Sequence, residues 1–144
     1  MNSTAKFKAL FGLAKADGEV DMHEKLFISY LAEKQGLSNK ELKEQIRSDE
    51  KMSDLVKELS YDDKVDILVH LVKLMKVDGK VVLSEISYCE KAAEAFGFDK
   101  KSIGYLSVAL NDNPRIDPNF GLIRNEMKKY EKDRVWLVYS FSFR

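Results

Sequence analysis

The chain has 144 residues, enough for one domain with a sizeable core. Its 24 basic and 24 acidic residues give a formal net charge of zero, which weighs against nucleic acid as the main partner because duplex binding usually needs a basic excess. A single cysteine, Cys89, excludes an intrachain disulfide, and no apolar run approaches the roughly 20 residues of a transmembrane segment. We therefore expect a cytoplasmic globular protein.

The spacing of apolar residues predicts an all-α fold of about eight helices. Proline first occurs at Pro114, so none interrupts the chain before that point. In the second helix the inward residues are expected to be Leu26, Phe27, Tyr30 and Leu31. The expected helices are, in chain order, one that ends near Ala16, one from Asp21 to Gly36, one over about 39–48, a shorter one over 51–59, one from Ser60 to Asp78-Gly79, one over about 83–96, one that begins at Asp99 and a last one that begins at Asp117.

Capping residues give the clearest helix starts. Asp21 with Glu24, and Ser38 with Glu41, have the capping-box spacing, in which the first side chain accepts from a backbone amide and the second reaches back. The Asp117-Pro118 pair is expected to be the N-cap and first residue of the last helix, because proline is favoured there.

The most informative feature is a segment that occurs twice. Residues 10–22 read LFGLAKADGEVDM and residues 71–83 read LVKLMKVDGKVVL, at a constant offset of 61. Such a repeat implies two copies of one helical unit folded against each other. We expect a single domain (1–144) that contains pseudo-symmetric halves over about 5–50 and 60–110 and then a C-terminal helix and tail over 117–144.

Each copy turns at an Asp-Gly pair. Glycine accepts positive φ and so suits a sharp reversal, and Val20 and Val81 are expected to plug the two turns into the core. The spacing of Gly, an aliphatic residue and Glu also matches the second half of an EF-hand loop. Positions 1 and 3 of that loop would be Leu13 and Lys15 in the first copy, which cannot ligate calcium, so an EF-hand interpretation fails.

The duplicated pattern resembles the TerB-like helical domain family, which is named for a tellurite-resistance protein and is similar to the N-terminal region of certain DjlA-type co-chaperones. The family pattern A-x-x-D-G-x-(V/I)-(S/D)-x-x-E matches residues 14–24, and a degenerate copy matches 75–85. In the second copy Lys80 replaces an acid and Val82 replaces the capping residue. The resemblance covers about residues 5–110 and implies no established enzymatic reaction. It implies an acidic surface site that is sometimes proposed to bind metal: Asp17, Glu24, Asp78 and Glu85.

Two interpretations of these four acidic residues stay open. In one they are structural, since Asp satisfies turn amides and Glu caps a helix N-terminus. In the other the two turns come together to form a divalent-metal site; no other cofactor is expected. Zinc usually needs more His or Cys than His23, His70 and Cys89 supply, and Cys89 is expected to be a core residue.

Three functions follow as hypotheses. The first is a non-catalytic binding or stress-response module of the TerB-like type, which acts through protein contacts and a metal. The second is a metal-dependent enzyme with paired carboxylates, although the sequence contains no evident nucleophile or general base. The third is a structural assembly protein that dimerises through its C-terminus.

The C-terminal tail has a different pattern from the rest of the chain. In residues 135–143 five large apolar side chains alternate with Trp136, Val138 and two serines, which predicts a strand. A strand leaves backbone groups that need partners. We expect pairing with the same segment of a second chain in a homodimer; packing of the tail as an arm on the chain's own helices, or a further helix, are the alternatives.

Overall fold

The computed structural model describes residues 3–16 and 18–132. In these residues eight α-helices and one 3-10 turn account for all the regular structure apart from an isolated β-bridge, so the all-α prediction is confirmed. The elements are α1 (Ser3–Ala14), α2 (Met22–Lys34), α3 (Asn39–Arg47), α4 (Met52–Lys57), α5 (Tyr61–Lys76), α6 (Leu83–Ala95), α7 (Lys101–Ala109), α8 (Phe120–Met127) and η1 (Lys128–Tyr130).

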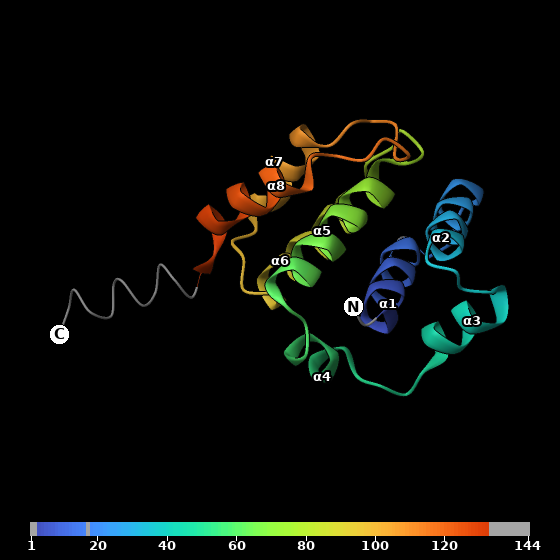
Figure 1. The fold of residues 1–144 in the computed structure, drawn as a ribbon. Helices are drawn as coiled ribbons and strands as arrows, with labels where there is room; N and C mark the ends of the chain where they lie inside the picture. The colour runs from blue at the N-terminus through green and yellow to red at the C-terminus, as the bar shows by residue number, and fades with distance from the viewer. Residues whose placement is uncertain (1–2, 17, 133–144) are drawn as a thin grey trace.

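Helices α1 and α5 form the centre of the fold. They pack on each other, with α2 and α3 on the α1 side and α6, α7 and α8 on the α5 side, while α4 packs against α1 (Figure 1). Burying large apolar side chains from both central helices stabilises the fold, at roughly 1.5–3 kcal/mol for each. The largest fully buried side chains are Phe7, Leu10, Leu13, Val65, Ile67, Leu68, Leu71, Val72, Leu74, Phe98, Leu106 and Met127.

The predicted capping boxes are present. The Glu24 amide donates to Asp21 Oδ1 at 2.9 Å, and the Asp21 amide donates to Glu24 Oε1 at 3.3 Å. Ser38 with Glu41 makes the same pair of hydrogen bonds, and Ser60 begins α5. These starts were predictable because every bond lies within one turn of chain.

The start of the last helix was predicted wrongly. Helix α8 begins at Phe120, and its N-cap is Asn119, whose Oδ1 accepts from the Leu122 amide at 3.1 Å. Asp117 precedes this cap in the loop, and its carboxylate forms ion pairs with Lys34 and with a lysine of α5. Tertiary partners therefore replace the capping role that the Asp-Pro pair suggested.

The bounds of the helices follow the sequence repeat. Helix α6 begins and ends 61 residues after α2, which is the offset of the sequence repeat. Helix α7 begins and ends 62 residues after α3. The residues with positive φ among those described form two pairs at the offset of the repeat: Gly18 with Gly79, and Gly36 with Gly97. Gly36 ends α2 and Gly97 ends α6, and each glycine and the residue after it donate backbone hydrogen bonds to equivalent carbonyls in the last turn of the helix. A two-fold superposition of the halves remains a prediction.

Two of the expected core residues are exposed. Leu26 is 60% exposed because the buried face of α2 is centred on Phe27, Ile28 and Leu31, on the opposite side of the helix. Val81 is 48% exposed, so only the first turn places its valine, Val20, against the core. The two turns therefore share a glycine with positive φ, but their valines pack differently.

The end of the described chain is joined to the turn after α6. The Asp99 amide donates to the Tyr130 carbonyl at 2.7 Å, and the Lys132 amide donates to the Gly97 carbonyl at 2.8 Å. The Lys132 ammonium also pairs with Glu94 at 2.7 Å. We call this set of contacts the C-terminal clasp. The strand predicted over 135–143 lies outside the described residues.

The described helices include none with both the length and the apolar character needed to cross a lipid bilayer.

Candidate functional site

The four acidic residues predicted from the sequence have different surroundings. Asp17 lies outside the described residues. Glu24 and Glu85 are buried, 3% and 6% exposed, at equivalent places in the first turns of α2 and α6. Asp78 is half-buried, and its Oδ1 accepts from the Lys80 amide at 2.9 Å. Glu24 and Asp78 thus have the local structural roles of the capping interpretation.

The two Asp-Gly turns nevertheless meet. The pKa of Asp21 is lowered chiefly by the hydrogen bond from the Glu24 amide, and a side-chain hydrogen bond with Asp78 lowers it further. The second turn therefore contacts the N-cap of the first. Within residues 3–16 and 18–132 no three His, Cys, Asp or Glu side chains are grouped as metal ligands would be.

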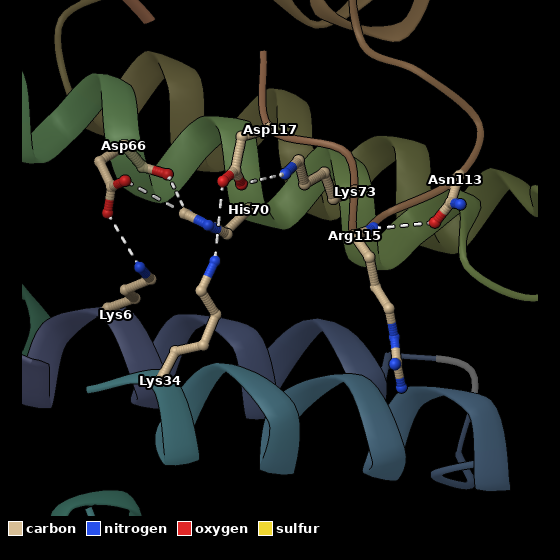
Figure 2. Close-up of polar contacts among 8 residues, drawn as sticks. All are labelled: Lys6, Lys34, Asp66, His70, Lys73, Asn113, Arg115 and Asp117. Carbon is tan, nitrogen blue, oxygen red and sulfur yellow. Dashed lines mark hydrogen bonds and ion pairs between the residues drawn. The ribbon is translucent and has the colours of Figure 1, made fainter. Parts of the chain in front are cut away.

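A second polar region lies where α1, α2 and α5 meet the loop between α7 and α8 (Figure 2). It contains four cationic side chains around two carboxylates, and we call it the basic cluster. Its members are Lys6, Lys34, Lys73, Arg115, Asp66 and Asp117.

One part of the basic cluster joins the central helices. The Lys6 ammonium of α1 lies 3.0 Å from Asp66 Oδ2 on α5, and the Lys6 side chain is only 5% exposed. His70, one turn further along α5, places Nδ1 2.9 Å from the Asp66 carbonyl oxygen and 3.4 Å from its Oδ1. Asp66 therefore has a cation on one side and an imidazole on the other (Figure 2).

The other part centres on Asp117 in the loop. Its carboxylate lies between two lysines, 3.7 Å from the Lys34 ammonium of α2 and 3.8 Å from the Lys73 ammonium of α5 (Figure 2). The Lys73 side chain is 3% exposed, whereas Asp117 is 73% exposed. Both distances exceed the roughly 2.7–2.9 Å of a charge-assisted hydrogen bond, so the buried Lys73 ammonium has only a distant and solvated counterion here.

The electrostatics of the two parts differ. Burial lowers the pKa of Lys73. The charges of Lys34 and Lys6 also lower it, whereas those of Asp117 and Asp66 raise it. Burial would raise the pKa of Asp66, but the hydrogen bond and charge of His70 together with Lys6 outweigh it, and the pKa falls to about 2. The Lys6 ammonium is thus closely paired with the Asp66 carboxylate, whereas the Lys73 ammonium has no carboxylate as close.

An aromatic ring of α2 supports the remaining cations. The Lys34 ammonium lies 5.4 Å from the centre of the Tyr30 ring, and the Arg115 guanidinium lies 4.9 Å from it. Hydrogen bonds from the amides of Asn113 and Arg115 to the side chains of Asn111 and Asn113 shape the loop that carries Arg115. The loop is therefore held in a defined course over α2.

One signal of the basic cluster is present in the sequence, although it was not among the predictions. Asp66, His70 and Lys73 are spaced i, i+4, i+7, so they share one face of α5. A polar face on a helix that is otherwise buried indicates either an ion network or a binding site. The partners from α2 and the loop follow only from tertiary structure.

The other candidates for chemistry are accounted for by burial or position. Cys89 is buried, and burial raises the pKa of its thiol to about 12, so it is protonated at neutral pH and unsuited to act as a nucleophile. His23 is exposed beside the first turn.

In comparisons with known proteins, no protein-family model, curated protein or solved structure gives a significant match to this chain. The resemblance to the TerB-like family therefore remains a prediction that rests on the duplicated motif.

Proposed function

We propose that this protein is a non-catalytic binding module of the TerB-like type, and that the basic cluster binds a small anion or an anionic group of a larger ligand. The observation that carries the proposal is the buried Lys73 ammonium, whose Asp117 partner is 3.8 Å away and largely exposed. Phosphate and carboxylate are the chemical classes that such a site would accept.

The energetics favour an added anion. A buried ammonium is costly unless it is paired closely and hydrogen-bonded. Asp117 divides its charge between two lysines and lies in a loop. An anion that displaces the Asp117 carboxylate from between Lys34 and Lys73 would make closer contacts with both and would reduce their mutual repulsion, with the Arg115 guanidinium nearby on the Tyr30 ring.

A titration with inorganic phosphate tests this proposal. Amide chemical shifts in a ¹H–¹⁵N spectrum are followed as phosphate replaces chloride at constant ionic strength. We expect saturable shifts at Lys73, Arg115 and Asp117, and Lys73→Met should weaken binding by about tenfold or more, which is the loss of one charge-assisted hydrogen bond.

Lys101→Met is the matched control, because Lys101 is exposed on α7 away from the cluster. It should bind phosphate as the parent does. If the amide shifts do not change when phosphate replaces chloride, the cluster is only a structural ion network. Equal phosphate affinity in Lys73→Met and the parent would lead to the same conclusion.

The contact between the two turns favours a second candidate function, the binding of a divalent cation. The Asp78 side chain lies close enough to Asp21 to lower the pKa of Asp21, and Asp17, Glu24 and Glu85 are the further oxygen ligands that the motif predicts. Isothermal titration with calcium, magnesium, manganese and zinc is the measurement. Weak binding that disappears in the Asp17→Asn, Asp78→Asn double variant would support the site; undiminished binding would place the ion elsewhere.

A further inference from the structure

An apolar groove of about 620 Å³ lies between α1, α4 and α6. Its lining includes Met52 and Val56 of α4 and Ala92, Ala95 and Phe96 at the end of α6. Ala95 is exposed, and the two α4 side chains are only partly covered. Apolar surface of this kind in a groove is typical of a docking site for another apolar segment.

The described chain ends beside this groove. Phe96 lines the groove, and the carbonyl of the next residue, Gly97, accepts a hydrogen bond from the Lys132 amide at 2.8 Å. The Lys132 side chain is fixed to Glu94 of α6 by an ion pair at 2.7 Å. Whatever follows Lys132 therefore begins at one end of the groove.

The segment that follows has the composition of an occupant. Residues 133–144 have a reach of up to about 40 Å when extended, whereas the 13 residues of α6 span about 20 Å. Tethering also gives such a segment a high effective concentration at the groove. Its large apolar residues are Val135, Trp136, Leu137, Val138, Tyr139, Phe141 and Phe143.

We propose that the C-terminal segment 133–144 of the same chain packs its apolar side chains into the groove between α1, α4 and α6. The C-terminal clasp sets the starting point of the segment, and the groove supplies apolar surface for its large side chains, Trp136 among them. A second copy of the chain could present the same segment, and the experiment separates that case.

Trp136 is the one tryptophan in the chain and lies within the segment, so its fluorescence reports where the segment lies. In the full-length protein we expect blue-shifted emission and weak quenching by iodide. Ala95→Glu and Ala95→Lys each place a charge in the groove at an exposed helical position, so they should expose Trp136, shift its emission to the red and raise the iodide quenching constant severalfold.

Val108→Glu is the matched control, because Val108 is 88% exposed on α7 and does not line the groove. It should leave the emission unchanged, and far-UV circular dichroism should show the same helix content in all variants. Light scattering across a range of concentrations gives the mass.

The outcomes divide clearly. A monomer whose Trp136 is shielded in the parent and in Val108→Glu, but exposed in both Ala95 variants, supports the proposal. Equal accessibility of Trp136 in parent and Ala95 variants overturns it, whether the residue is exposed or shielded in all of them. Shielding that is lost when a dimer dissociates also overturns it and favours an exchange between two copies.

Discussion

The central helices α1 and α5 differ on the face that each presents to the opposite half of the fold. On α5 this face is polar: Asp66 and Lys73 are part of the basic cluster, with His70 between them. The positions on α1 that correspond to these three in the sequence repeat all carry small residues, which are Ala5, Ala9 and Gly12.

The small residues allow α6 to approach α1 closely. The Tyr88 hydroxyl donates to the Ala9 carbonyl at 2.9 Å, and a Cβ at Gly12 would clash with that hydroxyl oxygen. On α5 the lysine that corresponds to Gly12 instead extends toward Asp117.

The segments that cover these two faces differ in the same way. Asp117 covers the α5 face, whereas Val56 of α4 lines the apolar groove beside α1. One face is thus closed by an ion pair, and the other is an open apolar groove. The comparison teaches that corresponding faces of the two central helices can hold an electrostatic contact in one half and an apolar surface in the other, according to the side chains that they carry and the segment that covers them.

The largest expected effect comes from the polar face. Asp66→Asn removes a carboxylate whose pKa is lowered from 3.8 to about 2. A carboxylate with a lowered folded-state pKa stabilises the protein above pH 4, and this contribution is lost as the pH falls from about 4 to 2. The parent should lose about 2 kcal/mol of unfolding free energy in this range that Asp66→Asn does not lose, as measured by urea unfolding at each pH.

The control for this measurement is Asp49→Asn, at an exposed position between α3 and α4. It should retain the parent's pH dependence. Parallel pH curves for the parent and Asp66→Asn would mean that Asp66 gains nothing from Lys6 and His70 in the folded state.

The small-residue face should show coupling between Gly12 and Tyr88. Alanine in a helix is favoured over glycine by about 1 kcal/mol, but at Gly12 the added Cβ would displace the Tyr88 hydroxyl and its hydrogen bond. We expect Gly12→Ala to be about 1 kcal/mol more favourable in a Tyr88→Phe background than in the parent, as measured by chemical denaturation.

Gly104→Ala on α7 is the reference for that cycle, because nothing lies within 4 Å of a Cβ built there. It should stabilise the protein by about 1 kcal/mol in either background. If Gly12→Ala behaves identically in both backgrounds, the close approach of α6 to α1 is not controlled by the Tyr88 hydroxyl.

The smallest effects concern the helix starts of the two halves. Helix α2 has the Asp21 capping box, whereas the corresponding residue before α6 is Val82, which provides no side-chain cap. Asp21→Ala should destabilise the protein by about 1 kcal/mol, and Val82→Ser should stabilise it by about 0.5–1 kcal/mol. Thermal unfolding measures both. Leu83→Ser, at an 84% exposed position inside the first turn of α6, should give no such gain.

Local features of this fold were predictable from the sequence, and tertiary ones were not. The caps at Asp21, Ser38 and Ser60 and the helix end at Gly36 depend on hydrogen bonds within a few residues, so spacing alone located them. Asp117 was misassigned because its carboxylate pairs with lysines from two distant helices.

The candidate sites show the same division. That the two Asp-Gly turns come together to form a metal site was one of two alternatives, and it remains a prediction; the Asp78 side chain of the second turn does lie near Asp21 at the end of the first. The basic cluster was not predicted, because Lys6, Lys34 and Lys73 lie on three helices whose arrangement no local pattern encodes. His70 is half-buried on α5, but its neighbours could not be inferred.

The C-terminal clasp has a consequence for the order in which the chain folds. Its backbone bonds between 97–99 and 130–132 close a loop that contains α7 and α8. Closing such a loop costs on the order of 3 kcal/mol of chain entropy, which the contacts of α8 with α5 must offset. This unit is expected to open below the global unfolding transition, so the amides of Asp99 and Lys132 should exchange with deuterium together and sooner than those of α5.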